Sequence, residues 1–212
     1  MRLQEIGLKT GTDKSAHTYK NISYLDIYER YFNKIKNDVK VFVEIGILNG
    51  KSLKMWKEYF PNAIIYGIDI NPNCKQFEED RIKILIGDQN NDDFLNKVKS
   101  EIKEIDILLD DGSHITTHQI KTFNYLHGLI KSGGFYIIED LRNSYEDFSG
   151  EHNLRAIWPG MNYNNQDDPL KNSRIDFNNW VAEMTKKLDF HEEENRIFGI
   201  YQHPMIIIFE NF

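Results

Sequence analysis

The stretch that decides the fold is Val41-Phe42-Val43-Glu44-Ile45-Gly46-Ile47-Leu48-Asn49-Gly50. Its first five residues predict a strand buried on both faces, and the segment that follows it, as far as Phe60, predicts a helix. Gly46 and Gly50 permit a sharp turn between the two elements and a close approach of the backbone to a ligand. Glu44 offers a carboxylate to the hydroxyl or ammonium groups of that ligand. The stretch therefore predicts a nucleoside site, although βα turns also contain glycine for structural reasons alone.

Composition places the chain among globular proteins that act on small molecules. Its 212 residues are sufficient for one substantial core, and we expect a single domain over residues 1–212. The one cysteine, Cys74, cannot form an intrachain disulfide, which favours a reducing, cytoplasmic location. The opening residues carry no apolar run of secretory length, and the longest later run, Met205 to Phe209, is too short to span a membrane. The formal net charge of −7 argues against nucleic acid as a partner.

Apolar strands and amphipathic helices alternate along the chain. The predicted strands cover residues 41–45, 63–68, 81–86, 104–109 and 135–138, and the predicted helices between them cover 51–60, a segment from Asp92, and 116–130. This alternation predicts an α/β fold with a parallel sheet and helices on both faces. After a helix at 176–188, strands at 196–201 and 205–210 are joined by a connection short enough only for an antiparallel hairpin.

Two segments outside this alternation are candidates for covering a ligand. Gly11-Thr12-Asp13-Lys14, with His17 and Tyr19 behind it, could be a helix cap and a solvated loop or part of a lid. The next helix carries side chains at core spacing, namely Tyr24, Ile27, Tyr28, Tyr31, Phe32 and Ile35. We expect residues 1–37 to form an N-terminal helical lid. Residues 143–175, which begin without periodicity, are expected to form a substrate loop.

Acidic residues follow each of the first five predicted strands. The carboxyl ends of parallel strands meet at one edge of a sheet, where α/β proteins bind their ligands. Asp69 is placed to accept from both ribose hydroxyls of a nucleoside, and Asp88 could accept from an exocyclic amino group. Any one of these acids could be a solvated loop residue or a helix cap. Their repetition favours a site lined by Glu44, Asp69, Asp88, Asp110, Asp111, Glu139 and Asp140.

Three of these acids suggest a metal site. Asp111, Glu139 and Asp140 follow two strands expected to be neighbours, so their carboxylates would converge and repel one another without a positive charge between them. Oxygen ligands without cysteine favour a hard cation, Mg²⁺ first, with Ca²⁺ or Mn²⁺ as alternatives. His114, three residues after Asp111, is a candidate general base, although a lone histidine is more often a packing or capping residue.

The sequence resembles class I S-adenosylmethionine-dependent methyltransferases, whose sheet is Rossmann-like and seven-stranded. This resemblance rests on Glu44-x-Gly46-x-x-x-Gly50, Asp69 and Gly87-Asp88. A narrower resemblance is to the metal-dependent sugar O-methyltransferases of the mycinamicin and macrocin type. It rests on Gly11-Thr12-Asp13-Lys14, Asp110-Asp111-Gly112-Ser113-His114, and Glu139-Asp140-Leu141 followed by Ser144-Tyr145. It implies that Asp111, Glu139 and Asp140 hold Mg²⁺ and that His114 is the general base.

The residues and the resemblance together give the expected site. Asp111 and His114 are the expected catalytic residues. The expected cofactor-binding residues are Glu44, Gly46, Gly50, Asp69, Ile70, Asp88, Gln89, Asp110 and Lys14. Candidate substrate contacts are His17, Tyr19 and Tyr145. The larger macrolide enzymes carry an additional N-terminal domain that helps to assemble their oligomers, and a homo-oligomer is an open expectation for this chain.

The expected reaction is transfer of a methyl group from S-adenosylmethionine to a sugar hydroxyl, assisted by Mg²⁺ and by a histidine base. The acceptor could be a nucleotide-activated sugar, or a glycoconjugate or capsule sugar as in polysaccharide biosynthesis. A vicinal diol would chelate the ion, and a catechol or another small-molecule diol satisfies the same geometry. Two other classes stay open: a NAD-dependent oxidoreductase, although the Gly-x-Gly-x-x-Gly turn is missing, and a non-catalytic ligand-binding relative.

Overall fold

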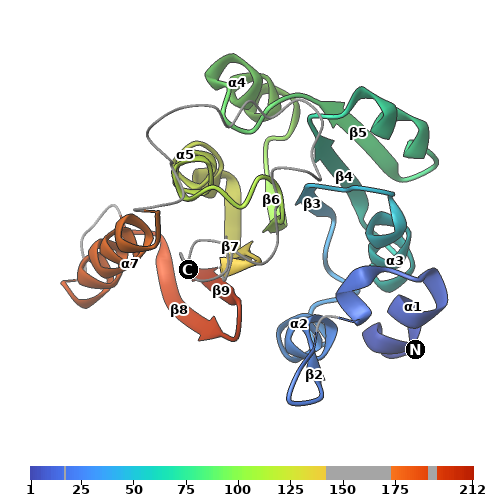
Figure 1. Cartoon of the computed structure of the whole chain (residues 1–212), viewed down its shortest axis with the longest axis horizontal. Helices are drawn as coiled ribbons and strands as arrows, with labels where there is room; N and C mark the ends of the chain where they lie inside the picture. The colour runs from blue at the N-terminus through green and yellow to red at the C-terminus, as the bar shows by residue number, and fades with distance from the viewer. Residues whose placement is uncertain (17, 142–172, 191–194) are drawn as a thin grey trace.

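The computed structural model describes residues 1–16, 18–141, 173–190 and 195–212. It contains a seven-stranded sheet of order β5-β4-β3-β6-β7-β9-β8 (Figure 1). The strands are β3 (Val41–Ile45), β4 (Ile64–Asp69), β5 (Ile82–Ile86), β6 (Ile105–Asp110), β7 (Ile130–Ile138), β8 (Ile197–His203) and β9 (Ile206–Asn211). The first five are parallel, and β9 runs antiparallel to both β7 and β8. This confirms the predicted mostly parallel sheet with a C-terminal antiparallel hairpin.

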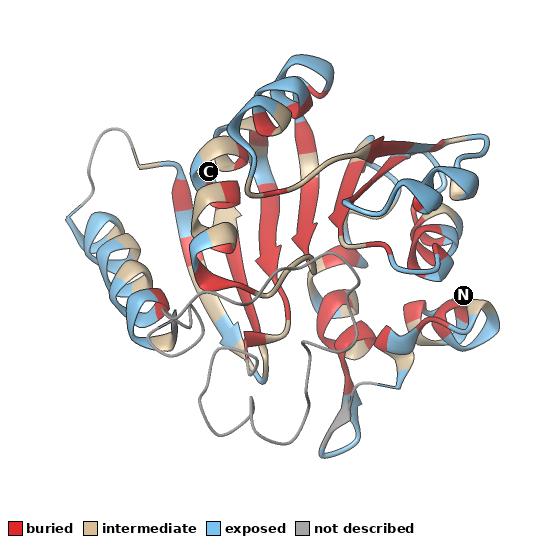
Figure 2. Ribbon diagram, turned by 45° about the horizontal axis from the view of Figure 1, so that its top comes forward, coloured by how far each residue is buried: buried red, intermediate tan, exposed pale blue. Residues whose placement is uncertain are grey.

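Helices cover both faces of the sheet (Figures 1 and 2). One face carries α1 (Leu3–Thr10), α2 (Tyr24–Phe32) and α3 (Lys51–Tyr59), and the other carries α4 (Asp92–Glu101), α5 (Thr116–Leu126) and α7 (Ser173–Asp189). Short elements complete the described chain: η1 (Asp13–Ser15), β1 (Thr18–Tyr19), β2 (Ile22–Ser23), η2 (Pro72–Phe77) and η3 (His127–Leu129). None of the described helices has the length and apolar character needed to cross a membrane.

Alternate strand residues face two separate apolar cores. Phe42 packs with the helices of the first face, whereas its neighbour Val43 packs with those of the second. The first core is centred on Trp56, which is fully buried, and its ring lies 4.7 Å from that of Phe42 and 5.9 Å from that of Phe60. This alternation is the period-two pattern of strands buried on both sides, and Figure 2 shows the central strands buried between the helices.

Several observed element boundaries differ from the boundaries predicted from the sequence. The helix predicted to extend to Ile130 ends at Leu126, and β7 already begins at Ile130, which pairs with Ile105 of β6. The apolar spacing continues past Leu126, but the chain tightens into η3 and the Arg196 guanidinium binds the carbonyls of Gly128 and Ile130. Residues 130–134, which precede the predicted strand 135–138, therefore also belong to β7.

The N-terminal segment also differs from the prediction in detail. The α1 helix lies within the predicted helical segment 1–37, although its bounds were not predicted, and α2 ends at Phe32, before the predicted core residue Ile35. Leu3 and Ile6 of α1 are buried in the first core. The lid assigned to residues 1–37 stays a prediction. The predicted substrate loop, 143–175, lies outside the described residues except for its last three, which begin α7.

The strand register brings the polar ends of four strands level. Ile45 pairs with Ile68 on one side and with Asp110 on the other, and Asp110 pairs in turn with Ile138. Backbone hydrogen bonds extend this register by one residue, from Gly46 N to the Ile68 carbonyl and from Glu139 N to the Asp110 carbonyl. The residues that follow each strand therefore meet at one edge, as predicted for a parallel sheet.

Truncating Trp56 tests the first core. We expect Trp56→Ala to lower the free energy of unfolding by about 3–5 kcal/mol, because it leaves a large cavity among aromatic rings. Urea denaturation measures this. Leu8→Ala, which truncates a side chain that is 65% exposed on α1, is the control and should change stability by less than about 0.5 kcal/mol. A loss below about 1 kcal/mol for Trp56→Ala would contradict this view of the core.

Candidate active site

A first pocket opens at the carboxyl ends of β3, β4 and β5. It is lined by Ile45, Gly46, Ile68, Asp69, Ile70, Gly87, Asp88, Gln89, Gly112 and Ser113. Asp69 is held in place by backbone N–H groups, since Oδ2 accepts from Ile47 at 3.0 Å and Oδ1 accepts from Asn71 at 2.8 Å. Ile70 is 52% exposed and presents an apolar surface to the pocket. Apolar walls with two acids suit a flat base joined to a hydroxylated sugar.

Gln89 fastens the loop after β6 to this pocket. Its amide nitrogen donates to both carboxylate oxygens of Asp110, at 3.1 and 3.2 Å, and its carbonyl oxygen accepts from Ser113 N at 2.7 Å. A Cβ on Gly112 would lie 2.0 Å from the same carbonyl oxygen, so a larger residue there would displace the Gln89 side chain from this position. Asp110 is fully buried and does not line the pocket, and burial raises its pKa to about 6. Its observed role is to support the loop.

Gly46 separates the first pocket from a second one and lines both. Its φ of 82° lies in the left-handed region, where residues with a Cβ are disfavoured. A Cβ at this position would also lie 2.0 Å from the Asp111 carbonyl oxygen. Glycine is therefore required for both reasons, and its small size keeps the two pockets adjacent.

The second pocket is strongly polar. It is lined by Asp13, Lys14, Tyr24, Gly46, Ile47, Leu48, Asn49, Ser52, Asp111, His114, Glu139 and Asp140. The Lys14 ammonium lies 2.5 Å from Asp111 Oδ2, 2.6 Å from Glu139 Oε2 and 3.4 Å from Glu44 Oε1. Although burial acts to lower the pKa of Lys14, these three carboxylates outweigh it and raise the pKa well above its ordinary value. The ammonium is therefore a permanent positive charge among these acids.

Two tyrosines of α2 hold the acids at the end of β7. The Tyr24 hydroxyl donates to Asp140 Oδ1 at 2.6 Å, and the Tyr28 hydroxyl donates to Glu139 Oε1. Both tyrosines were predicted to be core residues. Their four-residue spacing predicted a shared face of the helix, but nothing in it indicated that their hydroxyls reach the sheet edge. Burial first, and then these carboxylates, raise the pKa of both tyrosines, so both stay protonated donors.

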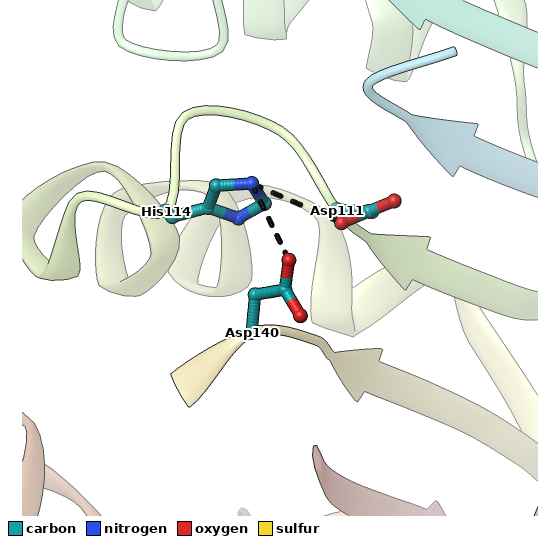
Figure 3. A group of neighbouring side chains, drawn as sticks. All are labelled: Asp111, His114 and Asp140. Atoms are coloured by element: carbon teal, nitrogen blue, oxygen red, sulfur yellow. Dashed lines mark ion pairs between the residues drawn. The ribbon is translucent and has the colours of Figure 1, made fainter. Parts of the chain in front are cut away.

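His114 faces two of the acids, as Figure 3 shows. Its Nε2 lies 4.0 Å from Asp111 Oδ1 and 3.8 Å from Asp140 Oδ2. His114 and Asp140 both adopt positive φ, at 57° and 56°, which is uncommon for residues with a side chain. Left-handed backbone at residues with a side chain clusters at active sites, where the surroundings hold it in place.

The acids and His114 fit a divalent cation. Ligand atoms of Asp111, His114 and Asp140 all lie within 4.8 Å of one another. Burial acts first to raise the pKa of Glu139 to about 8, with Asp111 adding to the effect, and burial also raises the pKa of Asp111. The single positive charge of Lys14 is smaller than the combined negative charge of Asp111, Glu139 and Asp140 when all three are ionised. Carboxylate oxygens in excess of positive charge are the donor set that a hard cation takes.

Most of the predicted site residues line one or both of the two pockets. Gly46, Asp69, Ile70, Asp88 and Gln89 line the first pocket, and Lys14, Asp111, His114, Glu139 and Asp140 line the second. Glu44 and Gly50 line neither pocket. Glu44 is fully buried and accepts from the Ser52 hydroxyl at 2.7 Å, and Gly50 is the N-cap of α3. Tyr19 lies on β1, and His17 and Tyr145 fall outside the described residues.

The fold and the two pockets define the architecture of class I methyltransferases. Over its whole length the chain matches the MycE methyltransferase from the mycinamycin biosynthetic pathway, solved in complex with Mg and SAH, with a TM-score of 0.76 and 26% identity. The match covers 55% of the MycE chain. A putative caffeoyl-CoA O-methyltransferase from Staphylococcus aureus shares the fold, with a TM-score of 0.57 and 16% identity over 99% of this chain and 97% of its own.

Curated relatives narrow the resemblance to sugar O-methyltransferases, as predicted. The chain is 39% identical over 141 residues to the 8-demethyl-8-(2-methoxy-alpha-L-rhamnosyl)-tetracenomycin-C 3'-O-methyltransferase of Streptomyces olivaceus, covering 63% of this chain and 36% of the relative. It is 36% identical over 151 residues to the demethylmacrocin O-methyltransferase of Streptomyces fradiae, covering 68% and 34%. The chain thus spans about a third of the length of these relatives. No protein-family profile matches it.

Substituting Gly46 tests the contact between the two pockets. We expect Gly46→Ala to lower the free energy of unfolding by about 2 kcal/mol or more, because the new Cβ meets a backbone carbonyl and φ is positive. Chemical denaturation measures this. Gly128→Ala is the matched control, since no atom lies within 4 Å of its added Cβ, and it should have little effect. Equal stability of the two variants would contradict the close packing at Gly46.

Glu44 should make the stability of the metal-free chain depend on pH. Burial raises its pKa from 4.5 to about 7, although Lys14 and Ser52 act to lower it. Between pH 4.5 and pH 7, Glu44 retains its proton in the folded chain but has released it in the unfolded chain. The resulting stabilisation is complete below pH 4.5 and is lost as the pH rises through 7.

We therefore expect the wild type to lose more stability between pH 5 and pH 8 than Glu44→Gln, by on the order of 3 kcal/mol. Denaturation curves recorded across this range in the presence of a chelator measure the difference. Glu58→Gln, at a surface ion pair with Lys9, is the control and should follow the wild type. Parallel pH profiles for the wild type and Glu44→Gln would contradict the assignment.

Proposed function

We propose that the chain transfers a methyl group from S-adenosylmethionine to a sugar hydroxyl. The observation that carries this proposal is the meeting of two unlike pockets at Gly46, one suited to a nucleoside and one lined by carboxylates and a histidine. The named activities of the curated relatives, which are O-methyltransferases of glycosylated natural products, support it. The SAH and Mg bound to MycE support the donor and the ion.

The donor would lie in the first pocket. Asp69 would accept hydrogen bonds from the ribose hydroxyls, with its carboxylate already oriented by two backbone N–H groups. Ile70 would pack against the base, and Asp88 would accept from its amino group. The sulfonium methyl would then point past Gly46 toward the second pocket, since no side chain stands between the two at that residue.

Asp111, Asp140 and Glu139 would hold a divalent cation, Mg²⁺ in the first instance. When bound, the cation would stabilise negative charge on the acceptor oxygen and lower the pKa of its hydroxyl, which is about 15 for a free alcohol. Tyr24 and Tyr28 would fix two of these carboxylates, because their hydroxyls donate to Asp140 and Glu139. Such supporting hydrogen bonds orient metal ligands in other proteins.

His114 would act as the general base. The acceptor oxygen forms a bond to the methyl carbon as the carbon–sulfur bond breaks, and the sulfonium leaves as the neutral thioether S-adenosylhomocysteine. The hydroxyl proton passes to His114 Nε2. Asp111 and Asp140, both within 4.0 Å of this nitrogen, would stabilise the imidazolium that results. Holding oxygen, carbon and sulfur in line is the remaining contribution of the two pockets.

The acceptor would be a sugar with two adjacent hydroxyls. The sugars named for the relatives belong to antibiotic glycosides, so a glycoside is the first acceptor to test, followed by nucleotide-activated and capsule sugars. Residues 143–175, together with His17, Tyr19 and Tyr145, are proposed to contact it. A homo-oligomer, and a role in polysaccharide biosynthesis if the acceptor is a capsule sugar, belong to the same proposal.

Two variants should separate chemistry from donor binding. We expect His114→Gln to lower kcat by about 10²–10⁴-fold and to leave the affinity for S-adenosylhomocysteine within about threefold, since the histidine acts on the acceptor. Asp69→Ala should weaken that affinity by at least about tenfold, because it removes the ribose acceptor. Calorimetric titration and mass-spectrometric detection of S-adenosylhomocysteine released from rhamnosides and nucleotide sugars measure the two effects.

Asp93→Ala, which removes an exposed acid from the first turn of α4, is the control and should preserve both properties. Full turnover by His114→Gln would exclude its role as the base. Failure of the wild type to bind S-adenosylhomocysteine would overturn the proposed reaction.

A further inference from the structure

The reaction proposed above gives Lys14 no role, although Lys14 is the most enclosed charged side chain of the second pocket apart from Glu139. Its side chain is 3% exposed, and its ammonium lies 2.5 Å from Asp111 Oδ2 and 2.6 Å from Glu139 Oε2. Burying a lysine is unfavourable unless its charge is balanced, and here two carboxylates from different strands balance it. The ammonium therefore joins the ends of β6 and β7.

The position of this ammonium conflicts with the proposed cation. Mg²⁺ binds carboxylate oxygens at about 2.0–2.1 Å, so an ion held by both Asp111 Oδ2 and Glu139 Oε2 would need the space that Lys14 Nζ occupies. An ammonium and a divalent ion at this separation would also repel each other strongly. The two cations cannot bind the same pair of oxygens at the same time.

A second acceptor lies within reach of the ammonium. Glu44 Oε1 is buried 3.4 Å from Lys14 Nζ, and among the described residues it makes no hydrogen bond. The other oxygen of Glu44 accepts from the Ser52 hydroxyl. Rotation of the flexible lysine side chain away from Asp111 and Glu139 and around Glu44 Oε1 would clear the space for the ion. It would also complete the hydrogen bonding of Glu44.

The segment that carries Lys14 can accommodate this rotation. Lys14 lies in η1, a single turn of three residues that follows Gly11, whose φ is 71°. The preceding helix, α1, is anchored separately by the buried side chains of Leu3 and Ile6. Four rotatable bonds in the lysine side chain allow its ammonium to move while the backbone of η1 stays in place.

We infer that Lys14 is a resident counter-cation that exchanges with the divalent ion: the ion takes Asp111 and Glu139, and the ammonium moves onto Glu44. This inference rests on the proposed metal-assisted function. It adds that Lys14 holds the acids together before the ion binds. In the metal-free chain the ammonium balances charge that would otherwise push β6 and β7 apart. In the metal-bound chain it neutralises Glu44, which the ion does not reach.

The test is the affinity for Mn²⁺ alone, measured by electron paramagnetic resonance of the free ion without donor or acceptor. We expect Lys14→Met, which keeps the length of the side chain and removes the competing charge, to bind Mn²⁺ at least about tenfold more tightly than the wild type. Lys9→Met is the matched control, since it removes a lysine from a surface pair with Glu58 on the same N-terminal segment, and its affinity should stay within about twofold.

Lys14→Met should also have a lower Tm than the wild type without metal, and Mn²⁺ should raise its Tm by more than it raises that of the wild type. If the variant does not fold without metal, recovery of the folded state on adding Mn²⁺ is the readout, and failure to recover would count against the exchange. An affinity for Mn²⁺ equal to or weaker than that of the wild type would overturn it. Absence of Mn²⁺ binding by the wild type and every variant would instead overturn the proposed metal-assisted reaction, and the exchange with it.

Discussion

The site depends on the balance of charge where β3, β6 and β7 end. Glu44, Asp111, Glu139 and Asp140 lie close together there, and Lys14 is the lysine that ion-pairs with three of them among the described residues. Burial first, and then repulsion from neighbouring carboxylates, raise the pKa of Glu44 and Glu139. A sheet edge of this kind favours the binding of further positive charge. That preference links the fold to a cation-assisted reaction.

The second constraint is steric and acts at a single residue. Because Gly46 has no side chain, the loop after β6 packs directly against the end of β3, with the Asp111 carbonyl where a Cβ would be. Gly46 therefore lines both the apolar-walled pocket that contains Asp69 and the acidic pocket that contains His114. A group carried by a ligand of the first pocket can then reach a ligand of the second. Such proximity fits the proposed methyl transfer between two ligands.

The sequence predicted the elements that depend on local pattern and missed those that depend on distant contacts. Apolar runs ending in acids located every strand of the parallel sheet, and register then placed Asp69 and Asp111 at one edge. Hydrophobic spacing could not show that the Tyr24 and Tyr28 hydroxyls reach carboxylates more than a hundred residues away. Nor could the strand-end rule show that Glu44 turns into the protein, because a side chain's direction depends on the pleat and on its partners.

The most direct test of the central claim is a crystal structure of the chain soaked with S-adenosylhomocysteine and Mn²⁺, in which anomalous scattering locates the ion. We expect the nucleoside to lie beside Gly46 and Asp69, with its sulfur directed toward His114, and the ion to lie among the carboxylates at the ends of β6 and β7. A nucleoside bound elsewhere, or an anomalous peak away from Asp111 and Asp140, would contradict it.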